Sequence, residues 1–254
     1  MLCAVALCSV TLSSAALGAD RGEELEKKLP AKFRKSPYSL MSLSVGHPND
    51  GFQLRAKRLK PNKYLKVRSS SKAYGHPALV LMLKRSAKQI GRSVHGSRLL
   101  VADISAKYGG SLSGHRSHQS GRDADVAFYM LDAQGKPIDA PRLLAFDGNG
   151  KAKDGSGLRF DDYRNWLLVK SWVDDTRAGL SHVFVSTPLR ARLLDYARHD
   201  ARFKSYVSKA AALLKQPSRS SAHDDHFHVR ISCPKRQTEI CHEQSKRRGS
   251  NAED

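Results

Sequence analysis

The chain has 254 residues, of which 40% are hydrophobic. This length suits one domain of ordinary size, with or without an extended arm, and the hydrophobic fraction suffices for a core, which excludes a wholly disordered protein. Lys and Arg outnumber Asp and Glu by 44 to 24, a formal net charge of +20. Such a charge favours polyanionic partners (nucleic acid, anionic lipid or cell-wall polymer) without choosing among them.

The N-terminal stretch 1–19 carries no charged side chain, is mostly small or apolar, and ends in small residues. It is shorter than a comfortable membrane span, so it predicts a secretory signal peptide with cleavage near Gly18 or Ala19, although no Lys or Arg precedes the apolar run. A buried N-terminal helix is the alternative. Export to the periplasm is therefore expected, with a polar arm at 20–35 and no transmembrane segment after signal removal.

The first half of the remaining chain predicts few regular elements. Residues 20–60 are polar, basic and interrupted by prolines, which indicates an arm or loop-rich stretch. The basic segment 55–72 is either a solvated surface or a rim that binds polyanions. A helix is expected from Pro77 to about Gly91, because Pro suits a first helical position and apolar residues then recur at helical spacing. A short strand is expected at 99–104.

The second half alternates loops, helices and strands. The polar, glycine-rich stretch 109–121 predicts irregular structure, and 135–160 predicts a surface loop. Strands are expected at 123–129, 182–185 and 226–231, and helices after Asp161-Asp162, from a cap and first turn at Thr187-Pro188 to about Arg198, and at 203–215. The charged tail 242–254 is predicted to be disordered. Without regular β-α-β alternation, the fold class is α+β: a central, mainly antiparallel sheet flanked by helices, with long loops around a cleft.

The last predicted strand carries two histidines on one face. With a side-chain period of two, His226, His228 and Arg230 share one face, while the residues between them are apolar and suit a core. Two imidazoles on one strand face lie close enough for one to bind a metal and the other to act beside it. HxH on a strand is also common in unrelated proteins.

A second polar segment supplies the other candidate ligands. His118 lies in the flexible stretch, Asp125 follows it, and Gly121 between them lets the chain fold back. One carboxylate and two imidazoles suit Zn²⁺ and leave a fourth position for water, as in catalytic sites. Taken singly, His118 could be a surface residue and Asp125 a cap or ion-pair partner. Asp123 shares the face of Asp125, and either orients a ligand imidazole or forms a surface salt bridge.

Two cysteines remain after signal removal, Cys233 and Cys241. In an exported chain, such a close pair predicts a local disulfide rather than a metal site.

Four segments resemble those of one known family. These segments are YGHPALV at 74–80, GHRSHQSGRDADV at 114–126, HVFVSTPL at 182–189 and HFHVRISCP at 226–234. On these segments the chain resembles the penicillin-insensitive murein endopeptidases, zinc peptidases related to the D-Ala-D-Ala metallopeptidases, lysostaphin-type enzymes and hedgehog domains. The resemblance runs from about residue 36 to Cys241 and implies one zinc endopeptidase domain over 36–241.

The resemblance also implies residue roles. His118, Asp125 and His228 match the family's zinc ligands, and His226 and His223 match its catalytic histidines. His115 falls where some members hold a second metal. Arg122 departs from the family, which has an apolar residue there, and is expected to change local packing or rim charge.

The implied function is hydrolysis of D-alanyl–diaminopimelate cross-links in peptidoglycan, with Zn²⁺ as cofactor. The alternatives are a D,D-carboxypeptidase of the same superfamily and a non-catalytic, zinc-stabilised wall-binding module. No recognised nucleic-acid-binding motif occurs, so no specific nucleic-acid partner is expected.

Overall fold

The structure is a computed structural model that describes residues 14–217 and 223–244. Its chain divides into two compact units, one up to Leu40 and one from Met41. The first unit holds helix α1 (Ser14–Lys27) and two short 3-10 helices, η1 (Ala31–Arg34) and η2 (Tyr38–Leu40). Helix α1 runs across the position predicted for signal cleavage, and residues 1–13 of the predicted signal peptide lie outside the described residues. Export and the boundaries at 19/20 and 35/36 stay predictions.

A six-stranded sheet forms the centre of the second unit, in the order β12-β11-β13-β7-β6-β4. The bounds of its strands are β4 Leu65–Val67, β6 Leu99–Val101, β7 Asp123–Ala127, β11 Leu180–Phe184, β12 Leu214–Lys215 and β13 His226–Ile231. The three inner pairings are antiparallel, whereas β4 and β12 each pair in parallel at an edge. The sheet is thus mixed, and the predicted α+β class with a mainly antiparallel centre is confirmed.

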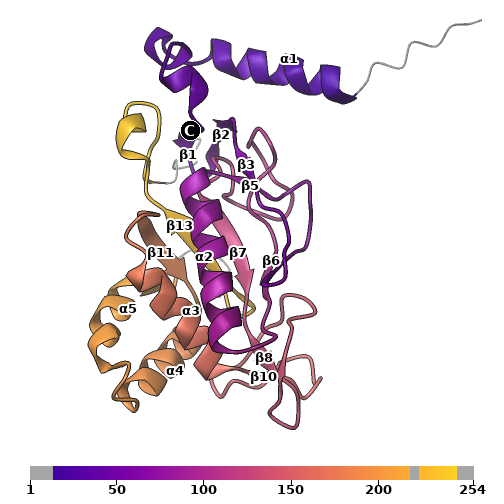
Figure 1. The fold of residues 1–254 in the computed structure, drawn as a ribbon, viewed down its shortest axis with the longest axis vertical. Helices are drawn as coiled ribbons and strands as arrows, with labels where there is room; N and C mark the ends of the chain where they lie inside the picture. The colour runs from indigo at the N-terminus through magenta and orange to yellow at the C-terminus, as the bar shows by residue number, and fades with distance from the viewer. Residues whose placement is uncertain (1–13, 218–222, 245–254) are drawn as a thin grey trace, which may run out of the picture. The chain divides into compact units, whose positions relative to one another are not determined.

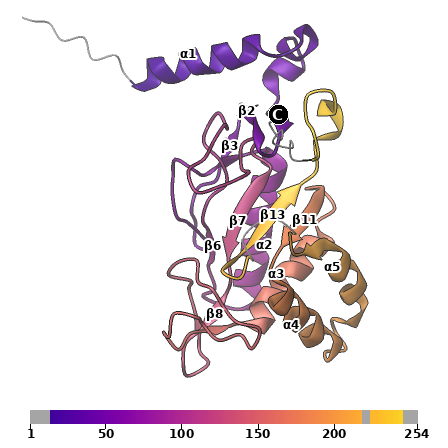
Figure 2. The same cartoon turned by 180° about the vertical axis from the view of Figure 1, so that it is seen from behind.

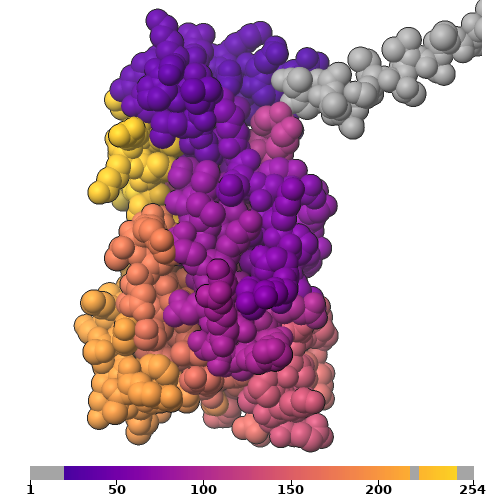
Figure 3. All heavy atoms as spheres, in the orientation of Figure 1, coloured from indigo at the N-terminus to yellow at the C-terminus, as the bar shows by residue number. Residues whose placement is uncertain are grey.

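Helices cover one face of this sheet. Helix α2 (Pro77–Ser93) lies in front of the sheet in Figure 1 and behind it in Figure 2, next to α3 (Asp162–Asp174). Helices α4 (Thr187–Arg198) and α5 (Val207–Leu213) pack beyond α3. The space-filling view shows α4 and α5 in orange and the segment 135–160 in pink on opposite sides of α2 (Figure 3). The core between sheet and helices includes Phe227 of β13, whose ring lies 5.4 Å from that of Trp172 in α3.

Small strand pairs complete the second unit. They are the hairpin β1 (Leu43–His47) and β2 (Asp50–Leu54), the pair β3 (Lys57–Arg58) and β5 (Tyr74–Gly75), and the sheet of β8 (Met130–Leu131), β9 (Pro137–Ile138) and β10 (Arg159–Phe160). The 3-10 helices η3 (Lys204–Tyr206) and η4 (Lys235–Gln237) lie in connecting segments. No helix in the described part of the chain is both long and apolar enough to span a bilayer.

Most predicted elements occur where the sequence places them. The helix from Pro77, the strand 226–231 and the irregular stretch 109–121 are confirmed, and Asp161 caps α3 by accepting a hydrogen bond from the Arg164 amide at 2.9 Å. These segments combine a clear periodicity with a capping residue at the boundary.

Four expectations need correction. Residues 20–60 hold the C-terminal part of α1 and the β1–β2 hairpin rather than only loops, because Leu43–His47 and Asp50–Leu54 pair with each other across a short turn despite the polar composition of the segment. The helix expected at 203–215 is shortened to α5, since Leu214–Lys215 pair with β11 instead. Ser186, not Thr187, occupies the N-cap position of α4. The loop 135–160 is also less exposed than expected, since Ala140 and Phe146 are buried.

Candidate metal centre

The candidate site lies on the sheet face opposite the helices, on the adjacent strands β7 and β13. Their antiparallel register places His228 opposite Asp125 and Arg230 opposite Asp123. Because Phe227, Val229 and Ile231 pack in the core, the alternation of β13 turns His226, His228 and Arg230 to the other face. The apolar residues of β13 therefore determine which way its histidines point.

Three imidazole nitrogens converge on one carboxylate oxygen. His118 Nε2 lies 3.3 Å from Asp125 Oδ1, and His226 Nε2 and His228 Nδ1 each lie 3.2 Å from the same oxygen. His118 and Asp125 side chains are almost fully buried, at 1% and 2% exposed. Among the described residues, neither His118 Nε2 nor Asp125 Oδ1 has a hydrogen-bond partner. Buried polar atoms are seldom left without partners, so this group of atoms indicates a missing ligand.

The far nitrogen of each ring fixes which atom carries its proton. His118 Nδ1 donates to the Ile104 carbonyl oxygen at 2.7 Å, and His228 Nε2 donates to Asp123 Oδ1 at 2.8 Å. His226 Nδ1 likewise donates to Asp225 Oδ1 at 2.6 Å. Since carbonyl and carboxylate oxygens only accept, each neutral ring directs a lone pair at Asp125. Lone pairs that point at one another repel, so either protons on the rings or a cation between them must separate these atoms.

The carboxylates shift the pKa values of the site in a direction that fits this requirement. Burial alone would lower the pKa of His226, but hydrogen bonds and charge from Asp125 and Asp225 raise it to about 10. The pKa of the buried His118 is also raised, by Asp125. Burial would raise the pKa of Asp125, yet the surrounding imidazoles hold it well below its ordinary value. The metal-free site thus attracts protons, and a bound cation on Asp125 would take their place.

The distances among these atoms fit a tetrahedral zinc ion. Two ligand atoms bound at ~2.0–2.1 Å with tetrahedral angles lie ~3.3 Å apart. The measured separations of 3.2 and 3.3 Å from Asp125 Oδ1 to His228 and His118 match that edge. Two imidazoles and one carboxylate are also a common ligand set of catalytic zinc. The residues present therefore fit the ion that the sequence predicts.

A strained turn brings His118 to the strands. His118 and Gly121 both have positive φ angles, of 72° and 71°. A Cβ on Gly121 would lie 1.8 Å from Gln53 Oε1, so only glycine fits beside this side chain. The Gly121 carbonyl accepts a hydrogen bond from the His76 amide at 2.8 Å, and the Ser105 hydroxyl donates to the His118 carbonyl. Contacts with several distant segments thus hold the turn in shape.

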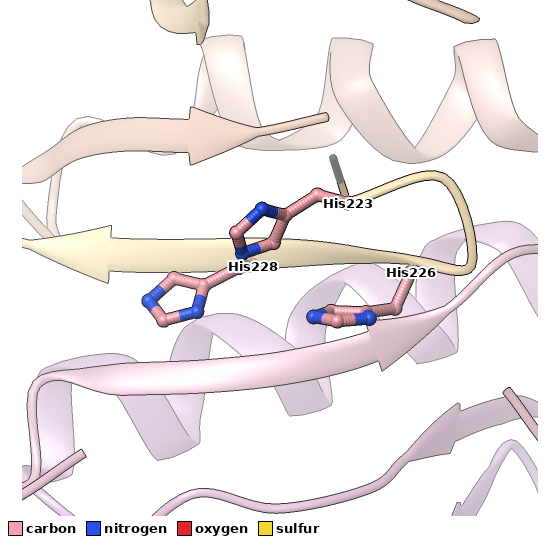
Figure 4. Close-up of side chains that lie close together, drawn as sticks. All are labelled: His223, His226 and His228. Carbon is pink, nitrogen blue, oxygen red and sulfur yellow. The ribbon is translucent and has the colours of Figure 1, made fainter. Parts of the chain in front are cut away.

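His223 and His115 lie on either side of the convergence point. Figure 4 shows the His223 ring over β13 beside His228, with His226 nearer the start of the strand; the His223 ring centroid lies 5.5 Å from that of His228 and 5.1 Å from that of His226. His115 Nδ1 lies 3.4 Å from Asp125 Oδ2, and its Nε2 donates to Asp103 Oδ2 at 2.8 Å. Every predicted site residue therefore lies within this one cluster. The cluster contains two groups of side chains whose potential ligand atoms lie within 4.8 Å of one another. One group is His223, His226 and His228, and the other is His115, His118 and Asp125.

Sequence reasoning missed the roles of two carboxylates and left two possible effects open for one arginine. Asp225 directly precedes His226, so adjacency could have indicated its role, but Asp103 is distant in sequence and has no spacing signal. Arg122 is fully buried, so of the two expected effects the structure supports the change in local packing. Its guanidinium donates to the His242 carbonyl at 2.6 Å and the Ile231 carbonyl at 3.3 Å. These hydrogen bonds connect the C-terminal segment to the start of β7. Within that segment, Cys233 and Cys241 form the predicted disulfide.

Comparison with known proteins agrees with this geometry. Residues 44–253 match the family model described as penicillin-insensitive murein endopeptidase. The chain belongs to this family. Its relatives include proteins named penicillin-insensitive murein endopeptidase from Haemophilus influenzae, 30% identical over 200 residues, and from Pectobacterium atrosepticum, 28% identical over 227 residues. The alignments cover 75% of this chain and 63% of the Haemophilus protein, and 86% of this chain and 74% of the Pectobacterium protein. This member of the family thus spans less than two thirds of the length of its Haemophilus relative.

Proposed function

We propose that this family member is an exported zinc metallopeptidase that hydrolyses D-alanyl–diaminopimelate cross-links of peptidoglycan in the periplasm. The observation that carries the proposal is the convergence of three imidazole nitrogens on Asp125 Oδ1 at 3.2–3.3 Å. Within the described part of the chain, His118 Nε2 and Asp125 Oδ1 have no hydrogen-bond partner. The family name of the relatives supports murein as substrate.

His118 Nε2, Asp125 Oδ1 and His228 Nδ1 are the proposed zinc ligands. These three residues would hold a zinc ion, which would supply Lewis-acid polarisation of the scissile carbonyl and a lowered pKa for an attacking water molecule. Asp123 accepts a hydrogen bond from His228 and holds its ring in the ligating tautomer. The Arg230 guanidinium donates to the same Asp123 oxygen at 2.5 Å and keeps that carboxylate in place. A second metal at His115 stays a prediction.

His226 is the proposed general base. Its Nε2 faces the ligand carboxylate, and Asp225 binds its other nitrogen, so the ring is oriented to take a proton from the attacking water. His226 then returns that proton to the leaving amine. His223 lies beside both rings and is the alternative base, or it steadies the negative charge that develops on the carbonyl oxygen.

Export agrees with two further features. A disulfide joins Cys233 and Cys241, and disulfides persist in oxidising compartments such as the periplasm. The net charge of +20 suits a substrate whose peptide stems carry carboxylates.

The test is digestion of purified sacculi by the mature protein with and without a chelator, together with metal analysis. Zinc-dependent conversion of cross-linked dimers to monomers is expected. Release of D-alanine from monomeric pentapeptide but no cleavage of dimers would instead indicate a D,D-carboxypeptidase. Zinc binding without either reaction would indicate a wall-binding module.

His226→Ala is the variant that tests the base. It should keep zinc and lose roughly 10²–10⁴-fold in turnover, the usual scale for a lost acid–base group. His199→Ala, an exposed histidine paired with Asp195 on α4, is the control and should be unchanged. Full turnover of His226→Ala would contradict the assignment.

A further inference from the structure

A buried carboxylate, Asp103, lies directly behind the metal centre. It follows strand β6 and is 1% exposed. Its Oδ2 accepts hydrogen bonds from three groups: Arg68 Nη2 at 2.6 Å, His115 Nε2 at 2.8 Å and Lys72 Nζ at 3.3 Å. Asp103 therefore anchors two cationic side chains and one imidazole at a single point.

Sheet geometry places this group at the edge of the site. Strands β4 and β6 are parallel, so Arg68 and Asp103 both lie beyond the same ends of neighbouring strands. The Asp125 amide donates to the Asp103 carbonyl at 2.8 Å, and the Ala102 amide donates to the Asp125 carbonyl at 2.9 Å. The His115 ring also links the two side chains, with Nε2 on Asp103 and Nδ1 3.4 Å from Asp125 Oδ2. One imidazole thus separates the anchored cations from a proposed zinc ligand.

The two cations exceed what Asp103 can neutralise. Arg68 and Lys72 carry two permanent positive charges against one carboxylate, and their side chains are 42% and 32% exposed. A guanidinium has five N–H donors and an ammonium three, whereas each of these side chains uses one hydrogen bond on Asp103. The remaining donors lie on solvent-accessible side chains whose positions Asp103 restrains.

We propose that Arg68 and Lys72 form a subsite that binds a carboxylate of the substrate, on the amino acid that supplies the scissile amide nitrogen. This inference rests on the proposed function. Each amino-bearing carbon of diaminopimelate also carries a carboxyl group, so a carboxylate stands next to the scissile nitrogen in the cross-link. An arginine and a lysine held together give the charge-assisted hydrogen bonds that recognise such a group. The subsite orients the leaving side of the peptide while the carbonyl side faces the metal centre.

The test uses two cross-linked dimers that differ only at this carboxylate, one free and one converted to a carboxamide. Zinc-loaded wild-type protein should cleave the free form with a kcat/KM ~10–100-fold higher, the scale of a lost charged hydrogen bond. In Arg68→Gln and Lys72→Gln that preference should fall several-fold, mainly through KM, with zinc content unchanged. Arg68→Lys keeps the charge and should retain part of the preference.

Binding supplies a second readout that does not need turnover. Zinc-loaded His226→Ala should bind the free dimer more tightly than the carboxamide dimer in calorimetry, and adding Arg68→Gln should reduce this difference in affinity several-fold. Arg98→Gln is the matched control, because Arg98 is 47% exposed and pairs with Asp139 at 2.6 Å, as Arg68 pairs with Asp103. It should leave the preference intact.

The outcomes separate the two proposals. If wild-type protein cleaves the dimers but does not distinguish them, or if Arg68→Gln and Lys72→Gln keep the full preference, the subsite is wrong and the proposed function stands. If zinc-loaded wild-type protein cleaves neither dimer, the proposed function is overturned, and the subsite's role in cleavage falls with it.

Discussion

The two segments that supply the imidazoles reach Asp125 by different means. Strand β13 delivers His226 and His228 through the alternation of a regular strand whose other face lies in the core. The turn 115–122 delivers His118 through positive φ angles and hydrogen bonds to distant parts of the chain. One half of the centre therefore depends on local sequence pattern, whereas the other half depends on contacts that form only in the folded protein.

The largest effects should come from removing a ligand from either segment. His228→Ala and His118→Ala should each abolish zinc retention and activity together, because two ligands rarely hold zinc tightly. Metal analysis after gel filtration measures retention. If His118→Ala retained zinc, the turn would not supply a necessary ligand, and β13 and Asp125 would be sufficient to bind the ion.

The turn should be far more sensitive to its backbone than to its surface. Gly121→Ala is expected to destabilise the protein by about 2–4 kcal/mol, because it combines a strained φ with a clash against Gln53. Gly114→Ala in the same region is the matched control: its φ is 83°, but no atom lies within 4 Å of the added Cβ. It should cost only about 1 kcal/mol. Chemical denaturation measures both, and equal losses would contradict the role assigned to Gln53.

The next largest effect should come from Asp123, the carboxylate that accepts a hydrogen bond from the proposed zinc ligand His228 on β13. Asp123→Asn weakens the acceptor for His228 Nε2 and is expected to lower zinc affinity by roughly 10–100-fold. Asp225→Asn, behind His226, should instead lower turnover and leave zinc affinity nearly unchanged. Competition with a chromogenic chelator measures the affinities. A similar loss of affinity in both variants would argue that His226, too, is a ligand.

The smallest effect concerns His76, the N-cap residue of α2, whose amide donates a hydrogen bond to the Gly121 carbonyl of the turn. Burial, with a contribution from Arg122, lowers the pKa of His76 from 6.5 to about 4. As the pH falls, His76 therefore takes up a proton in the unfolded chain at a higher pH than in the folded protein. The stability that neutral His76 contributes is present above about pH 6.5 and is lost as the pH falls toward 4. Protonation also removes the Nδ1 lone pair that accepts from the Ala78 amide at 3.2 Å.

His76→Asn keeps a capping side chain without this titration. The drop in unfolding free energy between pH 7 and pH 4.5 should be smaller in the variant than in the wild-type protein by about 1–2 kcal/mol. His95→Asn, an exposed histidine beyond the end of the same helix, is the control. An unchanged pH dependence in His76→Asn would show that His76 does not titrate in this range.

Local sequence patterns are enough to predict several parts of this protein. The alternation of 226–231 predicts which residues of β13 face the core, the Pro77 start predicts α2, and the spacing of Cys233 and Cys241 predicts their disulfide. The histidine segments also predict a family, which the match over residues 44–253 bears out. In each case neighbouring residues carry the physical information, through strand or helix periodicity or a short loop between two thiols.

Other features of the site follow only from contacts between distant segments of the folded chain. Asp103 meets Arg68, Lys72 and His115 because β4, β6 and β7 lie side by side, and no spacing in the chain encodes that meeting. Arg122 is charged and flanked by polar residues, so its composition favours the surface, yet carbonyl groups brought from the C-terminal segment let it be buried. Such contacts join residues far apart in sequence, and chain folding sets their distances.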